Sequence, residues 1–189
     1  MTDDLDKAEL ETKIVRLAEM PPMPDFAKQL DEIFFTSSAS QTFAGEAART
    51  AFRERWLGRY LDHDRDWFYV AVRGDRLAGY LAGAIDDPAR AARFSDIAYF
   101  KVIAEETAKY PAHLHVNVAE GARSGGIGSR LIAAFLADLR QAGVGGVHLV
   151  TGHNSRNIPF YHRNGFSLRK VIKGEATDSV MLARNVLQG

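Results

Sequence analysis

A glycine-rich segment in the second half of the sequence has the residue types that bind phosphate groups. Residues 123–129 read Arg-Ser-Gly-Gly-Ile-Gly-Ser and lie between a predicted strand that ends at Val118 and a predicted amphipathic helix. The first turn of a helix carries unpaired backbone N–H groups and the positive end of the helix dipole. Glycines let a pyrophosphate approach that backbone closely, so the segment predicts an anion-binding loop.

Two better-known phosphate-binding patterns do not fit this segment. The dinucleotide pattern G-x-G-x-x-G requires a third glycine where Leu131 follows Gly126 and Gly128, and the pattern G-x-x-x-x-G-K-[ST] requires a lysine that is missing. A tight turn between a strand and a helix also uses glycines without binding any ligand. A second motif is therefore needed to choose between the two interpretations.

A second group of residues with defined spacing follows further along the chain. Asn154, Tyr161, Gly165 and Phe166 lie in a predicted order of strand, loop, short helix and strand. Together the two motifs resemble the GNAT acyltransferase superfamily. Its pyrophosphate signature, R/Q-x-x-G-x-G/A, is matched within residues 123–128. Its later signature is an Asn seven residues before a Tyr that precedes a Gly-Phe pair, and the second group matches it in order and spacing.

A narrower resemblance and some departures accompany these motifs. Residues 110–115, Tyr-Pro-Ala-His-Leu-His, resemble the acetyltransferase-like domain attached to some O-GlcNAc hydrolases and its free-standing bacterial relatives. Ser124 and Gly125 stand where the family usually has a glycine and a basic residue, and Glu120 and Ala122 replace a common proline and an aromatic residue. These departures bear on the rigidity of the loop and on one phosphate contact.

The elements that must position these residues follow from the hydrophobic pattern. Apolar residues at helical spacing predict helices, and runs of strand-forming residues between turn residues predict strands. Strands are predicted at 13–17, 68–73, 77–85, 113–118, 147–150, 166–172 and 179–185. Helices are predicted after Asp25, which can cap the first of them, around the stripe Ala48, Phe52, Trp56 and Tyr60, within a helical insertion over 86–111, and at 126–141 and 158–163.

The order of these elements and the resemblance lead to the same expected fold. Antiparallel hairpins flank a central unit of strand, helix and strand. The resemblance implies the GNAT acyl-CoA N-acyltransferase fold, which is an α/β (α+β) fold with a central mixed, mostly antiparallel sheet and helices on both faces. Residues 1–189 are expected to form a single acetyltransferase domain, with residues 1–12 as a flexible N-terminal extension.

The resemblance implies acetyl-CoA as the co-substrate. In the family, its pyrophosphate binds the glycine loop and its pantetheine pairs with the backbone of the fourth strand. Asn157 has two interpretations in this sequence, since it can either cap the short helix or reach the cofactor. The implied cofactor-binding residues are Asn117, Val118, Arg123, Ser124, Gly125, Gly126, Ile127, Gly128, Ser129, Asn154, Asn157 and Tyr161.

The resemblance also implies direct transfer, in which an amine attacks the thioester through a tetrahedral intermediate and an acid protonates the departing thiolate. Tyr161 matches the position of that acid, and its alternative role is a core aromatic residue. Strand alternation places His113, His115 and Asn117 on one face. A histidine there is suited to take a proton from the ammonium form of the substrate, and a structural, hydrogen-bonded histidine is the alternative. Family members use different residues or water as this base.

Composition limits the other function classes. Lys plus Arg and Asp plus Glu both number 24, so the formal charge is zero and no nucleic-acid partner is expected. The sequence has no cysteine, which excludes a disulfide framework and a thiolate zinc site, and its six histidines lack the spacing of a metal site, so no metal is expected. No apolar run has the length of a membrane helix and no basic, apolar signal opens the chain. A cytoplasmic location without a membrane partner is therefore expected.

The expected partners are acetyl-CoA and an amine acceptor, and the identity of the acceptor stays open. A small-molecule amine and a protein lysine or N-terminus are both compatible with the sequence, and the resemblance implies a tendency to form a homodimer. A non-catalytic, acetyltransferase-like binding or sensing module is the alternative function. Such a module would be expected to lose part of the phosphate loop, and the presence of Arg123, Gly126 and Gly128 favours the enzyme.

Overall fold

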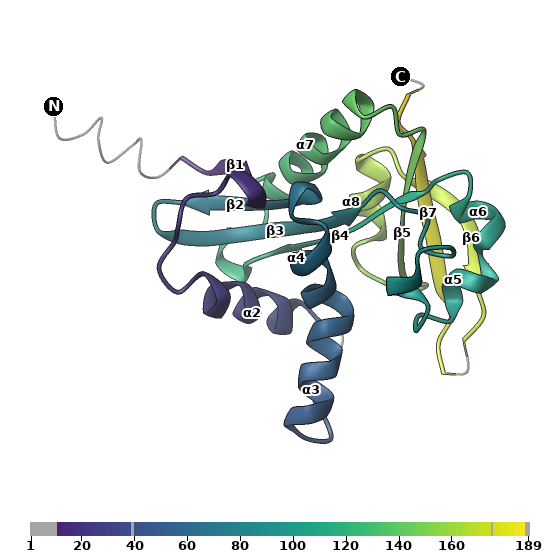
Figure 1. The fold of residues 1–189 in the computed structure, drawn as a ribbon, viewed down its shortest axis with the longest axis horizontal. Coiled ribbons are helices and arrows are strands. Elements are labelled where there is room, and N and C mark those ends of the chain that lie inside the picture. Colours follow the sequence, from purple (N-terminus) through teal and green to yellow (C-terminus); the bar gives the residue numbers. More distant parts are fainter. Residues whose placement is uncertain (1–10, 39, 175, 188–189) are drawn as a thin grey trace, which may run out of the picture. The chain divides into compact units, whose positions relative to one another are not determined.

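The computed structural model describes residues 11–38, 40–174 and 176–187, and its strands follow the order β1-β2-β3-β4-β5-β7-β6 (Figure 1). The chain forms two compact units. The first comprises residues 1–82 and 116–135, and the second comprises residues 83–115 and 136–189. Strand β4, Ala112–Val118, and helix α7, Ile127–Gln141, each run from one unit into the other. Four of the five strand pairings with a defined register are antiparallel, so the predicted mixed, mostly antiparallel fold is confirmed.

The first unit is built on an antiparallel arrangement of β1, Lys13–Arg16, β2, Phe68–Arg73, and β3, Arg76–Ala84. β2 and β3 are joined by the predicted two-residue turn, in which Gly74 has a φ of +56° that a glycine adopts without strain. The hairpin prediction is therefore confirmed. Of the predicted N-terminal extension, residues 1–10 lie outside the described residues. Thr12 is buried, and its carbonyl oxygen accepts a 2.7 Å hydrogen bond from Arg130 Nη2.

Helix α2, Phe26–Ser37, packs on this hairpin through an apolar face and one amide side chain. Leu30, Ile33 and Phe34 are buried. Gln29 donates from Nε2 to the carbonyl of Asp75 at 3.1 Å and accepts from the amide of Leu77 at 2.9 Å, which ties the helix to the turn. Asp25 occupies the N-cap position, but its φ is +51° and its side chain makes no capping hydrogen bond. The predicted capping role of Asp25 is wrong, because a cap requires extended backbone geometry at that residue.

The predicted aromatic helix consists of three consecutive pieces. They are α3, Glu46–Arg53, a π-helical turn η2, Glu54–Gly58, and α4, Arg59–His63. Burial increases along this segment, since α3 has no buried residue whereas Leu57 and Tyr60 are buried. A π-turn adds a residue to the helical turn and rotates the following face, which explains why Leu57 joins the core beside the predicted stripe. Figure 1 shows α3 extending away from β2 and β3.

Helices cover both faces of the first unit's strands. Neighbouring residues of β2 point to opposite faces. On one face Tyr69 packs edge-on against Phe135 of α7 with ring centroids 5.9 Å apart. On the other face Phe68 stacks on Tyr80 with ring centroids 5.5 Å apart. Asp31 on α2 and Arg53 on α3 form a 2.7 Å ion pair. The charges of this pair influence the pKa of the Tyr80 hydroxyl. The unit is completed by three short 3₁₀ turns, η1, Leu17–Glu19, η3, Arg65–Trp67, and η5, Glu120–Ala122.

The second unit contains the remaining strands, β5, Gly146–Gly152, β6, Ser167–Ile172, and β7, Ser179–Asn185. β4 and β5 pair in parallel with Ala112 opposite Val147, and parallel neighbours need a crossover connection, which α7 supplies. The helix buries the predicted apolar face, and Gly143 ends it with a φ of +71°. The second unit also contains the short helix α8, Ile158–Arg163.

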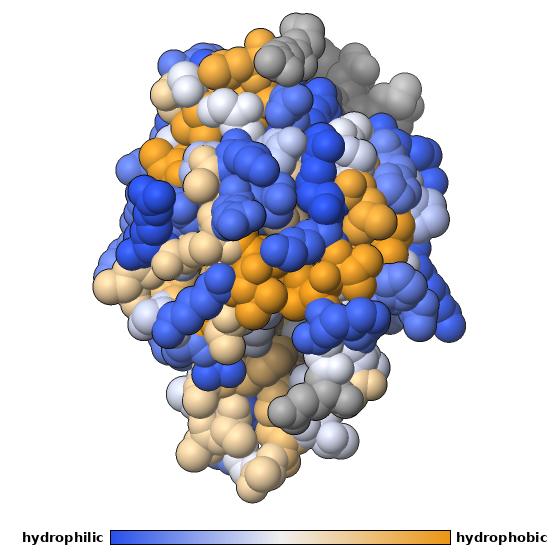
Figure 2. All heavy atoms as spheres, turned by 90° about the vertical axis from the view of Figure 1, so that its right-hand side faces the viewer, coloured by the Kyte–Doolittle hydropathy of each residue, from blue (hydrophilic) through white to orange (hydrophobic). Residues whose placement is uncertain are grey.

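The predicted helical insertion is confirmed as helical, but it consists of short turns instead of one long helix. These turns are η4, Ala92–Phe94, α5, Tyr99–Val102, and α6, Ala104–Thr107. Phe94 and Phe100 are buried, whereas Val102 is exposed together with Leu168 and Val171 of β6. Figure 2 looks onto the side of α5, α6 and β6 and shows hydrophobic groups between hydrophilic side chains. Among the described residues, no helix combines the length and apolar character needed to cross a bilayer.

Candidate active site

The glycine loop of the first unit has an open backbone surface. Ser124 and Gly126 have φ values of +67° and +72°, which turn the chain sharply between η5 and α7. A methyl group added to Gly126 would meet no atom within 4 Å, and one added to Gly125 would meet only the carbonyl oxygen of Ala122, at 3.6 Å. Because the described part of the chain leaves the Cβ side of Gly126 open and that of Gly125 nearly so, a ligand can reach the loop backbone there.

The start of α7 supplies hydrogen-bond donors next to this loop. The first backbone bond of the helix runs from the amide of Arg130 to the carbonyl of Gly126, at 3.0 Å. The amides of residues 127–129 precede that bond and have no acceptor within the helix, and they lie at the positive end of its dipole. Ile127 is buried and anchors this end in the core. The loop and the first turn therefore bring residues 123–129 together in a geometry that fits a pyrophosphate.

The end of β4 lies unusually close to β3 in the first unit. A Cβ atom on Gly79 would lie 2.8 Å from the carbonyl oxygen of Asn117 and 3.2 Å from Cα of Val118, so only glycine fits at this position. Asn117 Nδ2 donates a 2.7 Å hydrogen bond to the Tyr80 hydroxyl, and burial raises the pKa of that hydroxyl far above its usual range. The side chain of Asn117 is thus tied to β3.

Sequence reasoning missed the support that Gly79 and Tyr80 give to β4. A glycine inside a run of strand-forming residues signals a close approach of another backbone, and this signal was available in the sequence. The sequence did not indicate which strand approaches, because the contact joins residues nearly forty positions apart.

In the second unit, two asparagines predicted to contact the cofactor, Asn154 of the later motif and Asn157, lie after β5. Asn154 is exposed, and its Oδ1 lies 3.2 Å from Nδ1 of His153. Asn157 occupies the N-cap position of α8, but it makes no capping hydrogen bond, and its Oδ1 accepts a 3.2 Å hydrogen bond from the Thr151 hydroxyl. The capping interpretation of Asn157 is therefore wrong.

Tyr161 lies on α8 and is 4% exposed. Its ring packs against Phe160 and Phe166 with centroid distances of 5.2 and 6.1 Å. Burial raises the pKa of its hydroxyl to about 12, and this hydroxyl has no hydrogen-bond partner among the described residues. The side chain therefore stays protonated at neutral pH and keeps its proton available to donate.

The Gly-Phe pair that follows Tyr161 ends α8 and anchors β6. Gly165 has a φ of +81°, and a Cβ atom there would lie 3.0 Å from Nη1 of Arg184. The same Nη1 donates to the carbonyl oxygen of Asn164 at 2.7 Å. Phe166 is buried. This glycine is required both for the left-handed turn and for the close approach of the guanidinium group.

His113 lies in an aromatic cluster of the second unit. It is 4% exposed, and its ring is 4.7 Å from that of Phe94 and 5.8 Å from that of Phe100, both from the insertion. Burial lowers the pKa of His113 well below its usual value, and the neighbouring His148 lowers it further. These surroundings favour the structural interpretation of His113. His115, two residues along the same strand face, is only half-buried.

His148 is a buried residue that sequence reasoning did not single out. It pairs with His113 in the parallel register of β4 and β5, with ring centroids 5.6 Å apart. Its Nδ1 lies 2.6 Å from the carbonyl oxygen of Tyr110 and therefore carries a proton to donate. Burial lowers the pKa of His148 to about 4. Its position between the apolar residues Val147 and Leu149 was the available sign that it faces a covered side.

A metal site is not found in the part of the chain that the structure describes. Within residues 11–38, 40–174 and 176–187, no three His, Asp or Glu side chains come close enough together to hold an ion. The predicted site residues thus comprise the β4 end and glycine loop in the first unit, and His113, His115, Asn154, Asn157 and Tyr161 in the second.

Residues 29–166 match the model of the acetyltransferase (GNAT) family. This range contains the glycine loop and the later motif up to Phe166. It covers well over half of the chain and parts of both units.

Solved structures share the fold over nearly the whole chain. A structure named SsHAT has a TM-score of 0.69 and 22% identity, over 93% of this chain and 98% of that chain. A protein from Desulfovibrio desulfuricans, described as an acetyltransferase of the GNAT family, has a TM-score of 0.64 and 20% identity, over 93% and 99% of the two chains. A chain of the NatC complex, solved with Gag peptide and CoA, has a TM-score of 0.62 and 13% identity, over 93% and 98%.

The two buried histidines predict a loss of stability in mild acid. Below pH ~6.5 the unfolded chain binds protons at these side chains, whereas folded His148 stays neutral until its pKa of about 4. The free energy of unfolding should therefore fall as the pH drops from ~6.5 toward 4, by up to about 3 kcal/mol for His148. Urea unfolding at pH 7.5, 6.5 and 5.5 measures this slope.

A variant pair identifies the source of that slope. His148→Asn keeps a donor for the Tyr110 carbonyl but cannot titrate, so its slope between pH 6.5 and 5.5 should be shallower than that of the wild type. His63→Gln, at an exposed position, is the matched control and should keep the wild-type slope. An identical slope in His148→Asn and the wild type would contradict the assignment.

Proposed function

The chain belongs to the acetyltransferase (GNAT) family and is an acyltransferase, and we propose that it moves an acetyl group from acetyl-CoA to a primary amine. The observation that carries this proposal is the glycine loop before α7, whose uncovered backbone and first-turn amides suit a pyrophosphate. Since the family model crosses both compact units, we propose that they work as one functional domain.

The proposed cofactor contacts divide between the loop and the end of β4. The amides of residues 125–129 bind the pyrophosphate, with Arg123 as an exposed cation beside them. The backbone of Asn117 and Val118 pairs with the pantetheine. This role suits their surroundings. Gly79 lets β3 pack closely against this backbone, and the Asn117 side chain is held by its hydrogen bond to Tyr80.

The proposed reaction is a direct attack of the amine on the thioester carbon. The C–N bond forms, the carbonyl oxygen becomes an oxyanion that backbone N–H groups stabilise, and the C–S bond then breaks to release the thiolate. An ordinary thiol has a pKa of ~8.5, so Tyr161 with a pKa of about 12 is the weaker acid by about 3.5 pKa units. Tyr161 therefore stabilises the leaving sulfur chiefly as a hydrogen-bond donor. It transfers its proton to the sulfur only as the C–S bond breaks.

The proposed base is His115 or a water molecule that it orients. An amine of pKa ~10 is almost wholly protonated at neutral pH, so its proton must be removed before it attacks. His113 is a poorer candidate, because burial among aromatic rings opposes the charge that a base must accept. Asn154 and Asn157 are proposed cofactor contacts, and Asn157 is free of a capping role.

The acceptor is proposed to be either a small amine or the amino group of a peptide. The chain of the NatC complex that shares this fold was solved with a peptide, which supports testing peptides alongside small amines. The proposed assembly is a homodimer, in keeping with the tendency of the family.

Acetyl-CoA should bind with a micromolar dissociation constant, worth about 8 kcal/mol, and raise the melting temperature. Gly126→Val should abolish binding, since the added side chain would occupy the open side of the loop. Gly143→Val is the matched control, because Gly143 has nearly the same φ, +71°, and equally open surroundings at the other end of α7. Calorimetry measures acetyl-CoA binding to the wild type, Gly126→Val and Gly143→Val. Normal binding by Gly126→Val would show that this loop does not bind the pyrophosphate.

Tyr161→Phe should lower kcat by about 10²-fold while the dissociation constant of acetyl-CoA stays nearly constant, because one hydrogen bond to the leaving thiolate is lost. Release of free CoA in a screen of amines and peptides identifies an acceptor for this measurement. Phe160→Leu is a control for packing around the ring, since it alters the neighbouring aromatic contact and keeps the hydroxyl. Unchanged turnover in Tyr161→Phe would show that Tyr161 is a core aromatic residue without a role in proton transfer.

His115→Gln should lower turnover by about 10 to 10³-fold and flatten the rise of rate with pH near a histidine's titration. His113→Gln should lower the melting temperature and preserve the shape of the pH–rate profile, because its ring packs in a buried cluster. Profiles and melting curves of both variants are compared with the wild type. Two unaltered profiles would assign the proton transfer to water or to another group.

A further inference from the structure

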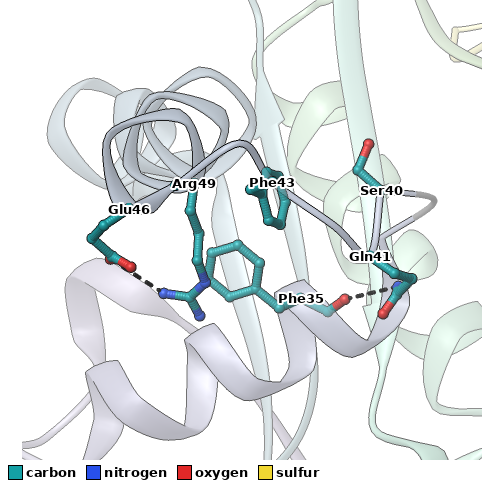
Figure 3. Close-up of a pocket in the computed structure, with 7 residues that line it drawn as sticks. Phe35, Ser40, Gln41, Phe43, Glu46 and Arg49 are labelled. Carbon is teal, nitrogen blue, oxygen red and sulfur yellow. Dashed lines mark hydrogen bonds and ion pairs between the residues drawn. The ribbon is translucent and has the colours of Figure 1, made fainter.

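Arg184 on β7 directs its guanidinium group at the end of a helix and not at a carboxylate. Arg49, for comparison, is paired with Glu46 at an open cavity between α2 and α3, with 3.6 Å between Nη1 and Oε1 (Figure 3). Arg184 is half-buried and forms no ion pair with an Asp or Glu that the structure describes. Its Nη1 donates a 2.7 Å hydrogen bond to the carbonyl oxygen of Asn164, the residue that follows α8. The guanidinium group therefore supports the backbone of another element.

The turn that ends α8 holds Tyr161 by its backbone and by its ring. The amide of Phe166 donates to the carbonyl oxygen of Tyr161 at 3.1 Å, and the amide of Gly165 donates to that of His162 at 3.0 Å. With Gly165 in the left-handed region, at a φ of +81°, these bonds form a Schellman motif. Such motifs commonly add an apolar contact between the two outer residues. Here that contact is the packing of Phe166 against the Tyr161 ring, with centroids 6.1 Å apart.

Arg184 closes this turn from outside the helix. The last carbonyls of a helix have no partner within it, and a hydrogen bond from a charged donor is stronger than one from a neutral donor. The guanidinium group reaches the Asn164 carbonyl only because Gly165 has no side chain, since a Cβ atom there would lie 3.0 Å from Nη1 and 3.1 Å from Cζ. Arg184 itself stands opposite Val147 in the register of β5 and β7. The donor is thus carried by a central strand of the second unit.

The contact bears on the position of Tyr161 and not on its acidity. Burial raises the pKa of the Tyr161 hydroxyl, so the side chain stays protonated at neutral pH with or without the guanidinium group. A hydrogen bond to a leaving sulfur depends steeply on distance and angle. A small displacement of a reacting group can therefore lower the rate strongly while the cofactor remains bound.

From these contacts we propose that Arg184 is a positioning residue for acetyl transfer, which fixes the turn at the end of α8 so that the Tyr161 hydroxyl meets the leaving sulfur. The inference rests on the proposed function, in which Tyr161 donates to that sulfur. Arg184 acts through the turn and exchanges no proton in the reaction.

Amide hydrogen exchange of the full chain without ligand tests the turn directly. Arg184→Met keeps the aliphatic stem and removes the donors, so exchange of the Gly165 and Phe166 amides should become about 10-fold faster. Arg163→Met is the matched control, because Arg163 lies on α8 itself and its exposed side chain makes no hydrogen bond or ion pair in the part of the chain described by the structure. This control should keep the wild-type exchange rates. Unchanged exchange in Arg184→Met would overturn the proposal.

A double-mutant cycle with Tyr161→Phe tests the link to catalysis, with the acceptor identified by CoA release. Arg184→Met should lower kcat by about 10-fold in the wild-type background, while the dissociation constant of acetyl-CoA stays nearly constant. In the Tyr161→Phe background it should lower kcat by less than about 2-fold, since no hydroxyl remains to be positioned. Arg184→Lys keeps a charged donor for the Asn164 carbonyl and should restore kcat to within about 3-fold of the wild type.

The results of this cycle separate the inference from the proposed function. Unchanged turnover in Tyr161→Phe would overturn the role of Tyr161 and this inference together. A loss of turnover in Tyr161→Phe, with an equal effect of Arg184→Met in both backgrounds, would overturn the positioning role alone. A general loss of folding lowers kcat by the same factor in both backgrounds, so it cannot produce the expected coupling.

Discussion

The parallel pairing of β4 with β5 is the constraint on which the remaining structure depends. Parallel neighbours cannot be joined by a tight turn, so the chain must leave the end of β4, form α7 and return as β5. The start of α7 consequently follows β4 after only η5 and the glycine loop, and the first-turn amides of the helix have no acceptor within the helix. The buried apolar face of α7 fixes the helix in position, and the left-handed residues Ser124 and Gly126 allow the sharp entry. The open glycine loop before α7 is thus a consequence of the topology combined with a few small residues.

Burial separates the titratable groups of this molecule into distinct roles. The pKa values of Tyr80 and Tyr161 are raised and those of His113 and His148 are lowered, because desolvation disfavours the charged form of each. All four are therefore uncharged at neutral pH. The tyrosines keep their protons, and the two buried histidines resist protonation.

Contacts from neighbouring elements fix the position of the end of β4 and the end of α8. Tyr80 and Gly79 on β3 hold the end of β4, and Arg184 on β7 binds the carbonyl at the end of α8 beside Gly165. In both cases a glycine makes room for a neighbouring group: the backbone of Asn117 and Val118 at Gly79, and the Arg184 guanidinium at Gly165. Helix α3 is the contrasting case, since it has no buried residue and contributes its side chains to an open cavity.

The sequence by itself determined the elements and the loop, because these depend on local patterns. The bounds of α8 and β7 agree with the predicted ranges, and the hairpin turn at Gly74 and the helix end at Gly143 follow from the ability of glycine to adopt positive φ. Residues 123–129 are contiguous, so their assembly into one loop required no knowledge of distant contacts.

Tertiary structure decided what the individual side chains do. Asp25 and Asn157 occupy the expected N-cap positions without capping, because a cap depends on backbone angles and on competing partners such as Thr151. Strand alternation placed His113 on the same face as His115, but only the packing of Phe94 and Phe100 over it decided its burial and its pKa. Desolvation and hydrogen bonding arise from groups that are distant in the chain, and a local pattern carries no information about which of them will meet.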